Sequence, residues 1–458
     1  MDTFRLTAAQ HRRLQHHLFD GSDLEAVAVG LLGQTAPATR RAHLLHRITE
    51  IPYAECVRAE ATVTWPTRRL RALLPEAGAG GMKVLKIHSH PNGYRGFSAL
   101  DDASDRELFA AVSLKVPGPH ISAVMLPDGE ILARLVMDDG TFRAVDRVAV
   151  VGDDLVFWPD PLAAANDFDQ RHRQVFGDRT TNLLRALTVA VVGISGTGSP
   201  TVEMLARLGV GRILLIDPDV VEGRNLNRIW GSTRSDAEVG ANKALMMRGH
   251  LDRMGLGTDV VDFQGRVDTV EAIQLISIAD VLIGCVDSLE GRDTLNRVAT
   301  FYTLPYLDIG VRLDADGQGG VASVSAAVHY LQPGGASLKS RGVYSDEGLR
   351  AEYLKRTDQP FYEDQVRRGY IRGVRVDSPA VISVNTLAAA SAVNELLARL
   401  HPFRTVNNAD VAVQKLLLTH GRTIHRGDGD PDLELAPLVG RGDCTPPIGC
   451  GRIETAAA

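Results

Sequence analysis

Residues 188–229 read TVAVVGISGTGSPTVEMLARLGVGRILLIDPDVVEGRNLNRI, and this stretch decides the fold of the second half of the chain. Its first apolar run, 189–192, has no polar alternation and therefore predicts a buried parallel strand. Gly193, Gly196 and Gly198 then interrupt the chain just before a predicted helix. Glycines let the backbone approach phosphates, and the free N–H groups at a helix N-terminus attract them. The stretch therefore predicts a nucleotide-binding turn.

The residues around this turn make the prediction more specific. Ser199 is placed to cap the helix, and a second apolar run, 212–216, ends at Asp217. At about this distance a Rossmann strand presents an acid to a ribose hydroxyl. The polar and cationic residues near this strand end are Asp217, Asp219, Asn225, Asn227, Arg228 and Lys243. A dehydrogenase needs no such cluster, whereas a triphosphate and its metal do.

The segment DPDVVEGRNLNRI, followed by Lys243, resembles the adenylation domain of ubiquitin-activating enzymes and their bacterial ThiF/MoeB-like relatives. Those enzymes use ATP to activate the C-terminal glycine of a ubiquitin-like protein as an acyl adenylate. The resemblance covers about residues 168–403. It assigns Gly193, Gly196 and Gly198 to the nucleotide turn, Asp217 to the ribose, Asn225, Arg228 and Lys243 to the phosphates, and Asp287 to Mg²⁺.

Two further positions follow from the same resemblance. Ser288 stands where the family usually has Asn, which is a small departure. The segment FDQRHRQVFG resembles the family's leading segment, in which an arginine, here Arg173, reaches a nucleotide across a pseudo-symmetric dimer. The resemblance therefore implies a homodimer formed through the adenylation domain.

A second motif, HSHPNGYRGFSALDD at residues 88–102, follows a predicted strand. His88 and His90 lie on the same face of that strand because side chains alternate, and Ser98 can cap the next helix. Two imidazoles and the Asp101 carboxylate make a three-ligand zinc site with an open position, as expected of a catalytic zinc. A His-x-His pair alone is more often only hydrogen-bonded.

The full spacing, His-x-His-Pro, six residues, Ser, two residues and Asp, resembles the JAMM (JAB/MPN) metalloproteases, which remove ubiquitin-like modifiers or trim their tails. The resemblance assigns His88, His90 and Asp101 to zinc and Ser98 to the oxyanion. It also requires an upstream glutamate as general base. Glu25, at the start of a predicted strand over 24–33, is the preferred candidate, and Glu50 and Glu55 remain open.

These motifs divide the 458-residue chain. We expect an α/β protein with a JAMM-type α/β metalloprotease domain followed by a Rossmann-like adenylation domain with a mainly parallel sheet. The predicted segments are a JAMM domain at 1–158, a linker and leading helix at 159–178, an adenylation domain at 179–425 and a C-terminal tail at 426–458.

Composition restricts the partners. The formal charge is -6, and no basic run offers a footprint for phosphates, which argues against nucleic-acid binding. No apolar run reaches about 18 residues and no signal peptide is evident, so we expect a cytoplasmic protein without a membrane span.

The cysteines bear on a second zinc and on acyl transfer. Cys285 lies in an apolar run and is expected to be a packing residue. Relatives carry two cysteines where this chain has Ser337 and Ser340, so Cys444 and Cys450 alone cannot build a four-cysteine zinc site. The candidate acyl acceptors are a nucleophile on a partner protein, a serine of 337–345 such as Ser337 or Ser340, and Cys444 or Cys450. We rank the first two above the tail thiols.

The combined hypothesis is a bifunctional enzyme of a bacterial ubiquitin-like pathway. It would adenylate the C-terminus of a ubiquitin-like protein with ATP and Mg²⁺, and a zinc-dependent isopeptidase or tail-processing activity would act on the same modifier. A conjugating enzyme is the expected further partner. The alternative is activation and trimming of a sulfur carrier for cofactor or cysteine biosynthesis, and a third class is a binding module with vestigial sites.

Overall fold

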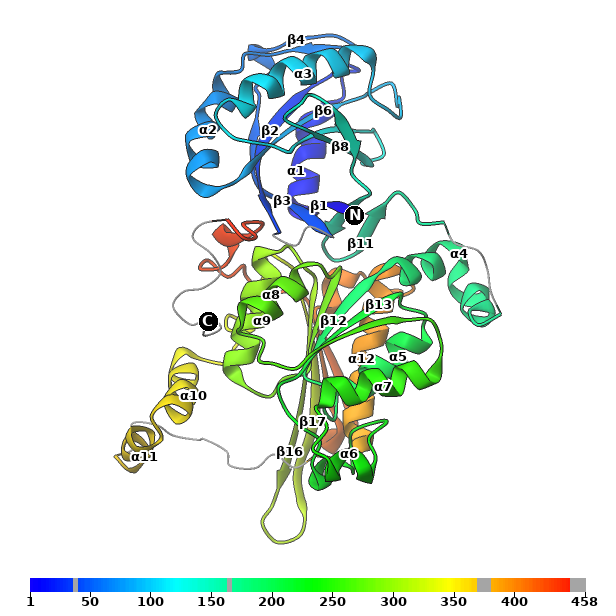
Figure 1. Cartoon of the computed structure of the whole chain (residues 1–458), viewed down its shortest axis with the longest axis vertical. Helices are drawn as coiled ribbons and strands as arrows, with labels where there is room; N and C mark the ends of the chain where they lie inside the picture. Colours follow the sequence, from blue (N-terminus) through cyan, green and yellow to red (C-terminus); the bar gives the residue numbers. More distant parts are fainter. Residues whose placement is uncertain (36–39, 163–166, 369–379, 445–458) are drawn as a thin grey trace. The chain divides into compact units, whose positions relative to one another are not determined.

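The computed structural model describes residues 1–35, 40–162, 167–368 and 380–444 (Figure 1). These residues form two compact units. The first contains Met1–Asp160, Thr300–Thr303 and 437–444, and the second contains Pro161–Ala299 and Leu304–Ala436.

The first unit is built on a nine-stranded mixed sheet in the order β11-β10-β1-β3-β2-β6-β7-β8-β9. Its strands are β1 (Asp2–Thr7), β2 (Val27–Gln34), β3 (Arg41–Glu50), β6 (Lys83–Ser89), β7 (His120–Met125), β8 (Ile131–Val136), β9 (Phe142–Ala144), β10 (Arg147–Val151) and β11 (Leu155–Trp158). A separate ribbon pairs β4 (Val57–Arg58) with β5 (Val63–Thr64). The helices are α1 (Ala8–Leu18), α2 (Arg68–Gly80) and α3 (Ala99–Ser113).

Successive side chains of these strands point to opposite faces of the sheet, and apolar ones form a hydrophobic core on each face. One hydrophobic cluster includes Leu85 and Ile87 of β6, and the other includes Val84 of the same strand together with Phe109 of α3. The predicted helix start is present: Ser98 is the N-cap of α3 and forms a capping box with Asp101. The sheet thus brings β6 and the first turn of α3 together.

The second unit is built on an eight-stranded sheet in the order β14-β13-β12-β15-β16-β17-β18-β19. Its strands are β12 (Thr188–Val192), β13 (Arg212–Ile216), β14 (Asp259–Phe263), β15 (Val281–Gly284), β16 (Tyr306–Ala315), β17 (Val321–Leu331), β18 (Val413–Leu417) and β19 (Arg422–Arg426). Strands β12 to β16 pair in parallel, and β16 to β19 pair antiparallel. The central strand β12 is buried along its whole length, as its uninterrupted apolar run predicts.

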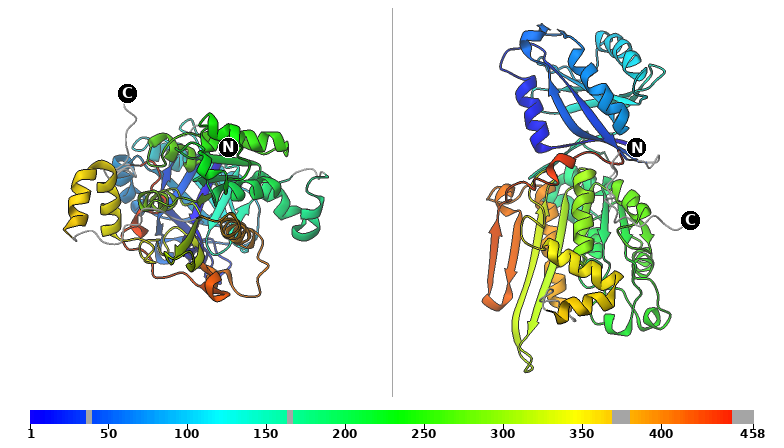
Figure 2. Two further views of the ribbon diagram at one scale, coloured as in Figure 1. Left: turned by 90° about the horizontal axis from the view of Figure 1, so that it is seen from below. Right: turned by 90° about the vertical axis from the view of Figure 1, so that its left-hand side faces the viewer.

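The helices of this unit are α4 (Gln170–Ala186), α5 (Gly198–Arg207), α6 (Arg234–Glu238), α7 (Lys243–Met254), α8 (Val270–Ser277), α9 (Leu289–Phe301), α10 (Asp346–Thr357), α11 (Gln359–Arg367) and α12 (Ile382–Leu400). Helices α8 and α9 lie on one face of the sheet, and α5, α7 and α12 lie on the other (Figure 1). The β16–β17 hairpin extends beyond the other strands (Figure 2). In the part of the chain that the structure describes, no helix is long and apolar enough to cross a bilayer.

The observed boundaries differ in part from those predicted. Position 179, the expected start of the adenylation domain, falls inside α4. The expected tail, 426–458, is not one free segment, because its residues 437–444 belong to the first compact unit. There Gly442 forms a β-bridge with Gln34, and the carbonyl oxygen of Val439 lies 2.7 Å from Nδ1 of His46. The remainder, 445–458, lies outside the described residues.

Candidate functional sites

The sequence motif of the first unit forms a compact cluster of side chains. His88 Nε2 lies 3.1 Å from His90 Nε2 and 3.0 Å from Oδ1 of Asp101. His90 Nε2 lies 3.7 Å from the other Asp101 oxygen. Strand β6 positions His88, the turn after it positions His90, and the first turn of α3 supplies Asp101. These nitrogen and oxygen donors are the types that zinc prefers, and both histidines are buried.

The electrostatics of the cluster follow from burial and mutual contact. Burial lowers the pKa of His88 to about 4, so this imidazole is neutral and can donate a lone pair. Burial acts to raise the pKa of Asp101, but hydrogen bonds with His88 and His90 outweigh it and lower that pKa. His90 Nδ1 lies 2.9 Å from the carbonyl oxygen of Tyr94, which orients its ring.

Glu25 lies beside this cluster, just before β2. Its Oε1 is 4.0 Å from His90 Nε2, and possible ligand atoms of Glu25, His88 and His90 all lie within 4.8 Å of one another. Burial raises the pKa of Glu25 to about 7, which suits a group that accepts a proton near neutral pH. Arg58 of β4 donates to the Glu25 carbonyl oxygen at 2.7 Å and so holds its backbone.

The other two glutamates considered from the sequence have different surroundings. Glu50 accepts a hydrogen bond from Arg13 at 2.7 Å. Glu55 accepts one from Arg69 at 2.7 Å and pairs with Arg68. Among the described residues, the group whose possible ligand atoms all lie within 4.8 Å of one another is Glu25, His88 and His90, so it includes neither of these two acids.

Ser98 lies at the edge of the same cluster. Its hydroxyl donates to Oδ2 of Asp101 at 2.7 Å, and its backbone N–H donates to the same oxygen at 2.7 Å. The serine thus holds the Asp101 carboxylate at the N-terminus of α3.

In the second unit, the glycine turn joins β12 to α5. A side chain at Gly198 would place its Cβ 1.8 Å from the carbonyl oxygen of Gly193, so this contact excludes every other residue type. Gly193 adopts a φ of +89°, which also favours glycine. One expectation was wrong: Ser199 does not cap α5. It lies inside the helix, which begins at Gly198 with Thr197 as its N-cap, and its hydroxyl accepts from Trp230 N and donates to Ser195 O.

The predicted nucleotide residues follow the strand ends, but several are engaged with other protein groups. Asp217 is buried and accepts from the backbone N–H groups of Ile194 at 2.5 Å and of Asp219 at 2.8 Å. Burial raises its pKa. Lys243 Nζ donates to Oδ2 of Asp219 at 2.8 Å. Asp217 therefore ties the end of β13 to the glycine turn.

Asn225 and Arg228 follow in the segment after β13. Asn225 is buried, and its Oδ1 accepts from the backbone N–H of Glu222 at 3.0 Å. Arg228 donates to the carbonyl oxygen of Arg224 at 2.8 Å. Its Cδ lies 3.3 Å from the position of a Cβ built on Gly196, so the arginine side chain lies over the glycine turn.

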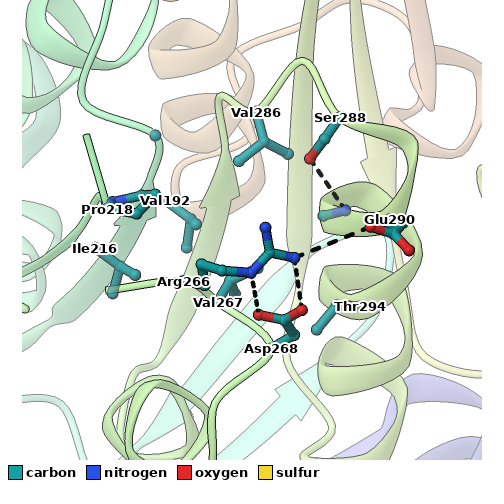
Figure 3. Close-up of a pocket in the computed structure, with 12 residues that line it drawn as sticks. Val192, Ile216, Pro218, Arg266, Val267, Asp268, Val286, Ser288, Glu290 and Thr294 are labelled. Carbon is teal, nitrogen blue, oxygen red and sulfur yellow. Dashed lines mark hydrogen bonds and ion pairs between the residues drawn. The ribbon is translucent and has the colours of Figure 1, made fainter. Parts of the chain in front are cut away.

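A pocket opens at the carboxyl ends of the central parallel strands (Figure 3). Its lining comprises Val192, Gly193, Ile216, Pro218, Arg266, Val267, Asp268, Val286, Ser288, Glu290, Gly291 and Thr294. Arg266 donates to Asp268 at 2.7 Å and lies 4.0 Å from Glu290, so one cation lies between two acids. Sequence reasoning missed these three residues, although Arg266 and Asp268 follow the end of β14, where an α/β sheet places ligand-binding side chains.

Asp287 and Arg173 are the remaining predicted residues of this site. Asp287 is exposed and lies between two residues that line the pocket. Arg173 donates to Asp169 at 3.0 Å and to Asn182 at 2.9 Å within its own chain. Its proposed contact with a second copy would require it to exchange these partners.

Helix α10 contacts Glu290, one of the residues that line this pocket. Arg356 of α10 donates to Oε2 of Glu290 at 3.1 Å, and Glu352 accepts from the Glu290 backbone N–H at 2.7 Å. The carboxylate of Glu352 thereby satisfies a free N–H at the start of α9. Helix α10 is thus connected to the pocket by two contacts with one residue.

The candidate acyl acceptors differ in their exposure to solvent. Ser337 is buried and donates to Oδ2 of Asp432 at 2.5 Å, whereas Ser340 is exposed. Cys444 is buried, and burial raises the pKa of its thiol. Burial also raises the pKa of the Cys285 thiol, to about 12, as befits a packing residue. Cys450 lies outside the described residues.

Comparison with known proteins gives a family match and more distant likenesses. The sequence model of the ThiF family matches residues 169–423, more than half of the chain. Ubiquitin-like modifier-activating enzyme 5 of Bombyx mori is 32% identical over 159 residues, which cover 33% of this chain and 38% of that protein. Adenylyltransferase and sulfurtransferase UBA4 of Meyerozyma guilliermondii is 30% identical over 145 residues, or 31% of this chain and 33% of that protein.

The chain thus spans 33 to 38% of the length of these curated relatives. Among solved structures, that of E. coli MccB with MccA-N7isoASN has a TM-score of 0.47 and 18% sequence identity, and covers 59% of this chain and 75% of that one.

Proposed function

The chain belongs to the ThiF family, and we propose that its second unit uses ATP to adenylate the C-terminal carboxylate of a ubiquitin-like protein. The observation that carries this proposal is the glycine turn beside a pocket at the carboxyl ends of β12 and β13. Helix α5 begins at this turn, so its free N–H groups favour a phosphate there. The similarity to ubiquitin-like modifier-activating enzymes supports the choice of substrate.

In the proposed reaction, a carboxylate oxygen of the modifier attacks the α-phosphorus of ATP. The bond between the α- and β-phosphates breaks, and pyrophosphate leaves with its electron pair. Lys243 and Arg228 would neutralise the phosphates, Asn225 would donate to them, and Asp217 would keep the turn in shape while it accepts from the ribose. Mg²⁺, held by Asp287, would neutralise charge that develops on the leaving oxygens.

For the first unit, we propose a zinc-dependent peptidase that releases or trims the same modifier. Two ligands of a tetrahedral zinc lie about 3.3 Å apart when each bond is about 2.0 to 2.1 Å long. The His88–His90 and His88–Asp101 separations, 3.1 and 3.0 Å, approach this value. The donor set of two imidazoles and one carboxylate therefore fits the metal, and a fourth position stays open for water.

The residues of this unit have distinct roles in the proposed hydrolysis. Zinc, when bound, lowers the pKa of its water toward about 7. Glu25 accepts a proton from the attacking water as the water oxygen bonds to the scissile carbonyl carbon. The C–N bond then breaks, its electron pair stays on nitrogen, and Glu25 delivers the proton to that nitrogen. The Ser98 hydroxyl donates to Asp101 in this structure, so it would turn toward the substrate to support the oxyanion.

We place both activities in the cytoplasm, in a bacterial ubiquitin-like pathway with a conjugating enzyme as the next partner. Exposure favours Ser340 over Ser337 as an acceptor on this chain, and direct attack by a partner's nucleophile on the adenylate remains the alternative. Activation of a sulfur carrier is the second candidate function, because a relative is named an adenylyltransferase and sulfurtransferase.

The proposed homodimer can be tested by mixing variants. If Arg173 completes a partner's site, mixing Arg173→Ala with Asp287→Ala protein restores part of the adenylation, because one mixed site then carries both native residues. No recovery on mixing would place Arg173 outside the partner's site.

The central test is mass spectrometry of the protein incubated with ATP, Mg²⁺ and small candidate modifiers. We expect an acyl adenylate on a ubiquitin-like protein that ends in glycine, and release of pyrophosphate. An acyl adenylate that sulfide consumes to give a thiocarboxylate would favour the sulfur-carrier function. No adenylate with any such protein would overturn the proposal.

A further inference from the structure

Beneath the histidine and acid cluster lies a second charged group that the proposed hydrolysis does not use. Lys86 of β6, Asp105 of α3 and Arg134 of β8 are all buried. Lys86 Nζ donates to Oδ1 of Asp105 at 2.7 Å, and Arg134 Nη2 donates to Oδ2 at 2.7 Å. Both oxygens of one fully buried carboxylate are thus held by cations from two strands.

The spacing of this group along α3 and β6 matches that of the proposed metal ligands. Asp105 follows Asp101 by about one helical turn, and Lys86 precedes His88 by two residues on the same face of β6. Four helical residues rise about 6.0 Å and two strand residues about 6.6 Å. The Asp105–Lys86 contact, at 2.7 Å, and the Asp101–His88 contact, at 3.0 Å, therefore form at one register of α3 on β6.

The sheet holds the two cations of this group in one row. Lys86 lies opposite Ser122 of β7, and Ser122 lies opposite Arg134 of β8. Asp105 therefore bridges the outer members of a row that crosses three strands, which restrains α3 in two directions.

Arg134 also reaches the segment that leads into α3. Its guanidinium pairs with Asp102 and lies 3.9 Å from the centre of the Phe97 ring. Phe97 immediately precedes the N-cap Ser98. The same arginine thus contacts residues on both sides of that cap.

Such a group is a poor source of stability, because desolvation of buried ions offsets most of their attraction. Its contacts are directional, however, and a shift of α3 along β6 would break both of them. We propose that Asp105, held between Lys86 and Arg134, is a positioning residue that sets the register of α3 on β6 and thereby aims Asp101 at the metal. This inference rests on the proposed zinc site.

The test uses full-length, metal-free protein titrated with Co²⁺, whose visible absorption reports ligand geometry. In Asp105→Asn the charge is lost and the shape is kept, so we expect about 10 to 100-fold weaker Co²⁺ binding and shifted absorption bands. Asp105→Glu keeps the charge but adds a methylene group, and we expect weaker binding there too because α3 is displaced. The matched control is Asp2→Asn, which removes a buried carboxylate on β1 that contacts His43.

Binding by both Asp105 variants that equals wild type would overturn the inference and leave the zinc site intact. Equal losses in Asp2→Asn would also overturn it, since a general effect on folding would then suffice. Hydrogen exchange in the metal-free variants is the second readout, and we expect faster exchange confined to α3. If wild-type protein binds no Co²⁺, the zinc proposal fails, and unchanged exchange in α3 would overturn the positioning role as well.

Discussion

The two candidate sites of this chain are assembled in opposite ways. In the first unit, the side chains meet one another: His88 lies 3.1 Å from His90 and 3.0 Å from Asp101. In the second unit, the side chains meet other protein groups, since Asp217 accepts from backbone N–H groups and Lys243 pairs with Asp219. Of the three glycines of the turn, Gly193 lines the pocket.

This difference follows from the size of the ligand. A metal ion needs a few donors within about 2 Å, so two elements that meet at one point suffice. A nucleotide spans several strand ends, so the turn and the sheet edge shape its site while long side chains exchange partners on binding. Changing a single side chain should therefore abolish almost all metal binding at the first site. At the second site it should weaken nucleotide binding only in part.

The largest effect is expected from removal of the metal ligands. Wild-type protein should carry about one zinc ion per chain, and the double variant His88→Ala, His90→Ala should carry none, because one carboxylate cannot hold zinc alone. Metal analysis of purified protein measures this, and adenylation by the same variant should be unchanged. Two tightly bound zinc ions in wild-type protein would contradict our expectation that the second unit holds none.

Asp287→Ala should have the next largest effect, in the other site. Pyrophosphate exchange that depends on the modifier should fall by at least about 100-fold, because the triphosphate loses the carboxylate proposed for its metal. Peptidase activity serves as the internal control, and Asp252→Ala, on the exposed side of α7, controls for loss of an acid in the same unit. Exchange at the wild-type rate in Asp287→Ala would show that another residue holds Mg²⁺.

Gly198→Ala tests whether backbone shape dominates the second site. The new Cβ would lie 1.8 Å from the Gly193 carbonyl oxygen, so the turn must open. Overpacking of this kind costs about 1 to 3 kcal/mol, and the same cost in binding would weaken ATP binding by about 5 to 150-fold, which calorimetry measures. Gly249→Ala in α7 meets only an arginine nitrogen at 3.6 Å and should bind ATP normally. Normal ATP binding by Gly198→Ala would show that the glycine turn is not part of the nucleotide site.

The smallest expected effect is a difference in acid sensitivity between the units. Burial lowers the pKa of His120 in the first unit to about 4 and that of His329 in the second to about 3. The pKa values of His11, His43 and His46, all in the first unit, are also lowered by burial. Unfolded histidines take up protons below about pH 6.5, so the stability that these residues contribute is complete above that pH and falls toward pH 4.

More such histidines lie in the first unit, so it should lose more stability between pH 7 and 5, by up to about 1.4 kcal/mol for each unit of pKa depression. Hydrogen exchange at the two pH values measures this for each unit. The His88→Ala, His90→Ala protein is the suitable background, because zinc release then plays no part. Earlier opening of the second unit at pH 5 would contradict this expectation.

Local patterns in the sequence predicted the elements that carry both sites. The apolar run at 189–192 is the central parallel strand β12, and the run at 212–216 coincides with β13. Ser98 caps α3 as expected, because a cap depends on residues three positions apart. The cap assigned to Ser199 was wrong, since α5 begins inside the glycine turn.

Contacts between residues far apart in the sequence could not be predicted from these local patterns. Nothing local indicates that Arg266 lies between Asp268 and Glu290, or that residues 437–444 pack in the first unit. The choice of Glu25 over Glu50 and Glu55 as a neighbour of the histidines is of the same kind, because sheet pairing places β2 beside β6.

The sequence by itself determined the glycine turn, the ends of the apolar strands and the spacing of the histidine motif, because backbone sterics and periodicity act over a few residues. Only the tertiary structure decided which charged groups meet. The register of α3 on β6 joins Asp101 to His88 and Asp105 to Lys86, and the order of the second sheet brings the ends of β12, β13 and β15 to one pocket. Such meetings depend on how whole elements pack, and packing is set by the entire core at once.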